Sequence, residues 1–257
     1  MTKIQIILLI ISLFFAFNLF GYQHSFLNLV SPSELQDLQT EVGISHRFNG
    51  PYDDRPLDNA FGMDLGANIG IQLRQALMYK TELKLGYIRT NHESVIEISN
   101  RFTPDAFPVQ AAANLQHFSY RDPFDYASRH DNLMLLLAVQ NKPVFDMLSM
   151  NVNLGYDMQH KRLVNGFGIG LKPVDNITLI GEYYPVGDRK SAPKEVKDLL
   201  GKYNCFAMGV KLDTYGHHFM FMLSNNDSMA PRELSMGTYV KKDLKLGFNI
   251  QRQMNFF

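Results

Sequence analysis

Two adjacent pairs of residues have side chains that can do chemistry, Ser45-His46 and His217-His218. A serine with a histidine suggests the nucleophile and base of a hydrolase, and two histidines suggest a metal site. In either case the side chains must converge on one point. Both pairs lie in stretches with strand-like alternation, where adjacent residues point to opposite faces of the sheet. A hydrolase would need a partner for Ser45 from another strand, so the sequence predicts no catalytic residue, no bound metal and no cofactor.

Two further motifs have simple structural explanations. The spaced glycines between Gly166 and Gly170 have strand alternation around them and no helix after them, unlike a phosphate-binding loop. We interpret them as small inward-facing residues that reduce crowding. Cys205 is the single cysteine, which excludes a disulfide within the chain and a site with several thiolates. We expect it to be a small buried or lipid-facing side chain.

Charged residues of both signs recur on the polar faces of the alternating stretches. The residues expected to face a common lumen are Glu41, Arg47, Arg74, Glu82, Lys84, Lys172, Glu182, Lys211, Asp213 and Lys245. Two interpretations stay open. The charges can pair and fill a closed interior, or they can line a pore or a ligand pocket.

The elements that position these charges have a sequence period of two. Clear alternation of apolar and polar residues runs through 42–48, 69–77, 150–157, 167–172, 206–212 and 244–256. Period-two alternation indicates strands with a different environment on each face. The last stretch is long enough for a tilted transmembrane strand, which needs roughly nine to eleven residues. Residues 133–139 and 217–223 are apolar on both faces, which predicts strands beside a packed part of the lumen.

The N-terminus looks like an export signal. Lys3 precedes an uncharged, mainly apolar run from Ile4 to Phe20, and the small residue Gly21 follows. We therefore predict a cleaved signal peptide at 1–21, with an uncleaved anchor helix as the alternative. Residues 22–39 would be a periplasmic segment or a plug of the lumen, and 40–257 the barrel.

The connections between the predicted strands differ in length. About 12 strands can be counted, an even number, so both termini would lie on the periplasmic side. The predicted outer loops are long: Asn49 to Leu65, Tyr120 to Asp131, Gly187 to Asn204 and Asn225 to Gly237. The predicted periplasmic turns are short. Together these features predict an all-β, antiparallel up-and-down transmembrane β-barrel in the outer membrane.

Several stretches also carry a family resemblance. They are GISHRF (43–48), FGMDLGANI (61–69), EYYPV (182–186), GHHFMFMLSNNDS (216–228) and GFNIQR (247–252). In this order they resemble an uncharacterised family of bacterial outer-membrane β-barrels, a domain of unknown function. The resemblance implies a signal-bearing barrel in the outer membrane and implies no activity.

The amino-acid composition limits the classes of binding partner that we expect. The 25 basic residues balance the 25 acidic ones, which argues against nucleic acid as a partner. The terminal Phe256-Phe257 resembles the aromatic end by which barrel-assembly machinery recognises its clients, and the exterior would contact outer-membrane lipid. We expect a non-enzymatic barrel for passage or binding of small solutes, or a structural component. The alternatives are an outer-membrane lipid hydrolase and a soluble periplasmic β-sandwich.

Overall fold

The computed structural model describes residues 26–32, 35–52, 66–121, 128–187 and 197–255. The predicted signal peptide and the aromatic pair at 256–257 lie outside these residues.

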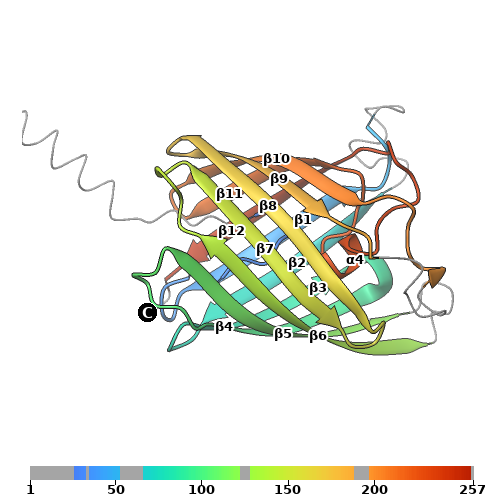
Figure 1. The fold of residues 1–257 in the computed structure, drawn as a ribbon, viewed down its shortest axis with the longest axis horizontal. Helices are drawn as coiled ribbons and strands as arrows, with labels where there is room; N and C mark the ends of the chain where they lie inside the picture. Colours follow the sequence, from blue (N-terminus) through green and yellow to red (C-terminus); the bar gives the residue numbers. More distant parts are fainter. Residues whose placement is uncertain (1–25, 33–34, 53–65, 122–127, 188–196, 256–257) are drawn as a thin grey trace, which may run out of the picture.

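Twelve antiparallel strands form a closed barrel (Figure 1). Each strand pairs with the next in the chain, and β1 pairs with β12 to complete the ring. The strands are β1 (Thr40–Phe48), β2 (Ala67–Ala76), β3 (Thr81–Ile88), β4 (Glu93–Arg101), β5 (Val109–Arg121), β6 (Arg129–Asn141), β7 (Leu148–Asp157), β8 (Arg162–Val174), β9 (Ile177–Tyr184), β10 (Cys205–Thr214), β11 (His217–Ser224) and β12 (Lys245–Met254). The predicted up-and-down barrel and its strand number are confirmed.

Side chains alternate between the outside and the inside of the barrel. In β6, Leu133, Leu135 and Leu137 are exposed, whereas Met134 and Leu136 are buried. The same alternation leaves leucines, isoleucines and aromatic residues exposed on the outside of most strands. A belt of this kind suits contact with lipid, because every strand edge is paired and its backbone polar groups are satisfied within the ring.

The two ends of the barrel differ in the length of their connections. At the end that holds the C-terminus, turns such as 175–176 and 215–216 are very short. The opposite end carries the connections 49–66, 185–204 and 225–244. The first end is therefore periplasmic and the second external. The predicted loop Tyr120 to Asp131 is too long, since β5 and β6 stay paired up to Arg121 and Arg129.

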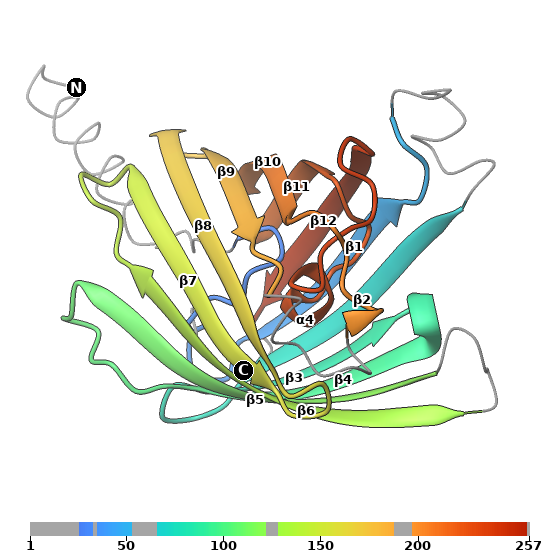
Figure 2. The same ribbon diagram turned by 45° about the vertical axis from the view of Figure 1, so that its right-hand side comes forward.

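Two segments occupy the interior. Residues 26–31, which we name the luminal segment, have Phe26, Leu27 and Leu29 buried against the inner face. From the external side, the connection between β11 and β12 folds inward and forms the short helix α4 (Pro231–Leu234), which the strands surround (Figures 1 and 2). A 3-10 turn, η1 (Thr90–His92), joins β3 to β4.

Candidate functional site

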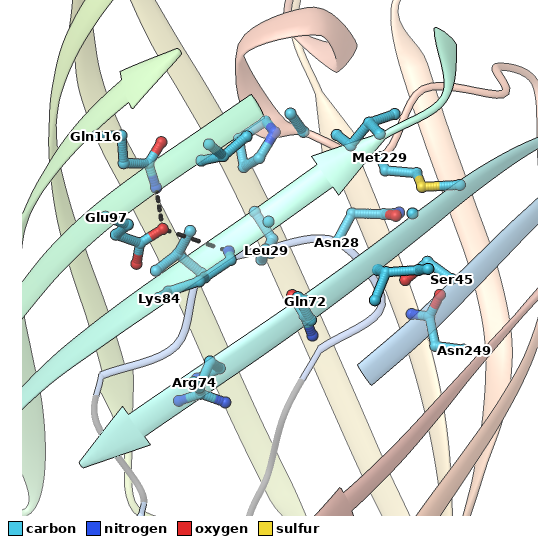
Figure 3. A pocket seen from close by; sticks show the side chains of 18 of the residues that line it. Asn28, Leu29, Ser45, Gln72, Arg74, Lys84, Glu97, Gln116, Met229 and Asn249 are labelled. Carbon is cyan, nitrogen blue, oxygen red and sulfur yellow. Dashed lines mark hydrogen bonds and ion pairs between the residues drawn. The ribbon is translucent and has the colours of Figure 1, made fainter. Parts of the chain in front are cut away.

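A cavity of about 150 Å³ lies between the luminal segment and the inner faces of β1 to β5. Met229 and Pro231 bound it on the side of α4. Figure 3 shows polar side chains from several strands around it. Those with a hydroxyl or amide group are Asn28, Ser31, Ser45, Gln72, Tyr87, Ser99, Gln116, Asn249 and Gln251.

A row of direct cross-strand partners crosses this side of the barrel. From β12 to β5 it consists of Gln253, Glu41, Arg74, Lys84, Glu97 and Gln116. Arg74 donates to Glu41 over 2.9 Å, and its other nitrogen donates to Glu82 over 2.7 Å. Lys84 and Gln116 both donate to Glu97, at 3.3 and 2.7 Å (Figure 3). Both cations on this wall of the cavity are therefore paired with carboxylates, two for Arg74 and one for Lys84.

Arg47 and Glu182 hold the tip of the luminal segment. Arg47, on β1, donates to the side-chain oxygens of Asn28 at 2.7 Å and Asn249 at 2.8 Å. Glu182, on β9, accepts from the backbone N–H and the side-chain amide of Asn28. Asn28 thus bridges a buried cation and a buried anion, each of which needs such partners in the barrel interior.

The remaining predicted lumen residues lie elsewhere. Lys211 is 3.4 Å from Asp213, which also bonds to His218 at 2.6 Å, on the inner face of β10 and β11. Lys172 lies 3.8 Å from Asp175 at the periplasmic end. Lys245 lies 3.3 Å from Asp227 at the external end. Eight of the ten charges therefore belong to several ion-paired groups, and Arg47 and Glu182 are joined through Asn28. Only Arg47, Arg74, Glu82 and Lys84 of the ten line the cavity.

Several polar residues of the interior were not among the predicted ones. Glu97 has the inward phase of β4, and its position between Ile96 and Ile98 is a signal that could have identified it. A second group of charged residues consists of Glu93 on β4, Arg162 on β8 and Arg232 on α4 itself. Arg232 is 2.5 Å from Glu93 and lies over the rings of Phe118 and Tyr120, at 5.0 and 4.9 Å from their centroids.

Arg162 completes the attachment of α4. It donates to the carbonyl oxygens of Arg232 and Ser235 and to the Ser235 hydroxyl, at 2.5, 3.1 and 2.8 Å. The last four carbonyl groups of any helix have no hydrogen-bond donor within the helix. In α4 the buried guanidinium of Arg162 is the donor for some of these carbonyl groups. This arrangement fixes the external connection inside the mouth of the barrel.

Replacing Arg232 with methionine should release α4. The Glu93 carboxylate would lose its ion pair while buried, a change that typically costs about 3–5 kcal/mol. Hydrogen exchange at the amides of 232–236 should then accelerate at least about a hundredfold. The double variant Arg232→Met/Glu93→Gln should recover part of the protection, because it leaves no unpaired charge. Unchanged exchange in the single variant would contradict the attachment.

The adjacent pairs that suggested chemistry are split between the two faces, as predicted. Ser45 lines the cavity, whereas the His46 ring stacks on Phe248 with centroids 4.9 Å apart. His218 is buried and bonded to Asp213, whereas His217 is half-buried and lies next to Arg252. Within the described ranges, no three His, Cys, Asp or Glu side chains form a metal-binding group. Neither α4 nor any other helix in those ranges has the length and apolar character needed to cross a membrane.

A closed twelve-strand antiparallel barrel with an apolar exterior and a polar, ion-paired interior is an outer-membrane β-barrel. Residues 130–254 match the family described as "Membrane bound beta barrel domain (DUF5777)". The predicted family resemblance and the predicted location in the outer membrane are confirmed. The barrel exterior therefore contacts membrane lipid, and the family description assigns no activity.

Other comparisons give distant likenesses. No curated protein matches the sequence. Among solved structures, the outer membrane protein Omp33 of Acinetobacter baumannii has 8% sequence identity and a TM-score of 0.46. The alignment covers 85% of this chain and 99% of the Omp33 chain. The outer membrane phospholipase A from Escherichia coli has 9% identity and a TM-score of 0.45, covering 88% of this chain and 99% of its own. Likenesses at this level carry no information about activity.

Proposed function

We propose that the chain is a non-enzymatic outer-membrane barrel that takes small polar solutes into its luminal cavity. The observation that carries this proposal is the composition of the cavity lining. Hydroxyl and amide groups offer both donors and acceptors, while the charges beside them are paired within the wall. Such a wall favours uncharged polar solutes, because a charged one would have to compete with existing ion pairs.

The placement of histidines supports a role without catalysis. A hydrolytic serine needs a base within hydrogen-bond distance. Ser45 lines the cavity, but the described residues that line this cavity include no histidine, and His46 points to the opposite face of β1. The histidines with carboxylate partners at 2.6 and 2.8 Å, His218 and His160, bond to Asp213 and Asp157 away from this cavity. A lipid hydrolase therefore remains the alternative with less support.

Filling the cavity should reduce solute uptake. Gly86 lines the cavity, and a Cβ atom there would have its nearest neighbour at 3.6 Å, so Gly86→Phe can project its ring into the free space. We expect swelling of proteoliposomes in neutral sugars to slow several-fold with this variant. The matched control is Leu85→Phe, which adds its ring on the lipid-facing side. Equal rates for both variants, or no uptake by the unmodified protein, would contradict the proposal.

We also propose that barrel-assembly machinery inserts the chain. The support is its class, a closed transmembrane barrel.

A further inference from the structure

The inner face of the barrel binds the luminal segment mainly through backbone atoms. The Glu182 carboxylate accepts from the N–H groups of Asn28 and Leu29, at 2.9 and 3.2 Å. The Asn153 side chain both accepts from the N–H of Val30, at 2.8 Å, and donates to its carbonyl, at 2.7 Å. Every peptide carries these groups, so this recognition does not depend on the side chains of the segment.

A third residue of the barrel, again an asparagine, extends the same pattern to the other side of the segment. Asn249, on β12, donates to the carbonyl of Leu27 over 2.7 Å. The bonding residues thus come from β7, β9 and β12, on different sides of the ring. Glu182, Asn153 and Asn249 are at most 4% exposed. Buried polar groups require partners, and here the partner is a stretch of peptide.

Apolar side chains of the segment occupy a slot with a glycine floor. A Cβ atom on Gly168 would lie 2.6 Å from atoms of both Phe26 and Leu29, and one on Gly166 would lie 2.5 Å from Leu29. Ile180 and Tyr184 belong to the same buried apolar cluster. The slot therefore accepts bulky apolar residues two or three positions apart along a chain that bends between them, since residues 27–29 form a bend.

At one position of the segment, the barrel also recognises a particular side chain. Asn28 donates from its amide to Glu182 over 3.0 Å and accepts from Arg47 over 2.7 Å. Its amide supplies both a donor and an acceptor at one place, which suits the pair of opposite charges around it.

The segment approaches the site from the periplasmic end. The carbonyl of Val30 and the hydroxyl of Ser31 contact Asn151 near the start of β7, and Leu35 donates to Glu82 near the start of β3. The chain then enters β1 at Thr40. Because odd-numbered strands start at the periplasmic end, a peptide can reach the site from that side.

From these contacts we infer that the lumen is a peptide-binding site. Its ligand class is a short peptide that bends around an asparagine with bulky apolar residues on both sides of it, and residues 26–30 of this chain are its resident ligand. A peptide of the same pattern supplied from the periplasmic side can replace the resident. This inference does not depend on whether solutes enter the neighbouring cavity.

The test uses the full chain with a weakened resident, Phe26→Ala/Leu29→Ala, reconstituted in detergent. A labelled, end-capped peptide of sequence Phe-Leu-Asn-Leu-Val-Ser is titrated by fluorescence anisotropy. We expect saturable binding to this variant and at least about tenfold weaker binding to the unmodified chain, where the resident competes. The gel mobility of unheated samples reports whether the barrel is folded, and the single variant Leu29→Ala serves if the double one is not.

A matched peptide separates backbone recognition from apolar adsorption. Methylation of the backbone nitrogens of its asparagine and following leucine removes both backbone donors to Glu182 and keeps all side chains. We expect this peptide to bind at least about tenfold more weakly, because the buried carboxylate would keep only the donors from the asparagine side chain and Tyr184. Equal binding of the two peptides, or no saturable binding to the weakened variants, would overturn the inference.

Discussion

Replacing Gly168 with valine is expected to expel the luminal segment while the barrel stays closed. The new Cβ atom would fall 2.6 Å from Phe26 and from Leu29, far inside van der Waals contact. The strand itself tolerates the change, since valine suits a β-strand and Gly168 pairs with Asn151 through backbone atoms. The cheapest response is therefore movement of the segment, which the barrel strands do not need for their own pairing.

The measurement is single-channel conductance in a planar bilayer. We expect it to rise several-fold in Gly168→Val, because the buried cluster around Phe26 and Leu29 would leave the lumen. The control is Gly181→Val on the outer face of β9, where the nearest atom to a new Cβ lies 3.5 Å away. A folded Gly168→Val barrel with unchanged conductance would show that the segment does not obstruct the lumen.

The strands and the direction of their side chains could be predicted from the sequence because both follow a local period. In β12, one face carries Phe248 and Ile250, and the other carries Asn249 and Gln251. Such alternation needs no knowledge of the rest of the chain. It also explains why charges assigned by phase alone, such as Glu41 and Lys211, are buried inside the ring.

The partners of those charges could not be predicted, because they depend on register. Glu41 faces Arg74, Arg74 faces Lys84, and Lys84 faces Glu97 only at the observed pairing of β1 to β4. A shift by one residue would turn each side chain to the other face of the sheet. The sequence gives the phase of each strand, whereas register emerges when twelve strands close into one ring.

The two segments inside the barrel have no periodic signal at all. Phe26 to Val30 is a short, mainly apolar stretch. Nothing in it indicates that it contacts Glu182 or Asn153, which lie more than a hundred residues away along the chain. Likewise, Arg232 is a single charged residue in a long connection. The strands β5 to β11 lie between it and its partner Glu93 in the sequence. The spaced glycines were correctly expected to be small inward residues, but the residues packed on them could not be foreseen.

The second large effect concerns pH at the external mouth. Burial and the nearby Glu93 carboxylate together raise the pKa of Glu233, on α4, to about 7, although Arg232 opposes the rise. Asp227 also favours the protonated form, and a hydrogen bond from Ser228 opposes it. When α4 leaves the mouth, Glu233 should return toward its ordinary value of 4.5.

The sign of the effect follows from this difference. Below pH 4.5, Glu233 is protonated in both states and its titration does not affect docking. As the pH rises from 4.5 to about 7, the undocked state ionises first and gains stability, so docking of α4 weakens over this range and stays weakened at higher pH. One pKa unit corresponds to a factor of about ten in the docking equilibrium, so the factor between pH 5.5 and pH 8 should be at least about ten.

Single-channel recordings with the pH changed on the external side measure this equilibrium as open probability. We expect openings to be more frequent at pH 8 than at pH 5.5, and Glu233→Gln to hold the low-pH behaviour at both values, because a neutral amide cannot ionise. Asp105→Asn is the control: Lys80 and Arg101 hold the pKa of Asp105 below its usual range, at a periplasmic turn remote from α4. If Glu233→Gln kept the pH dependence of the unmodified chain, another group would have to control the docking of α4.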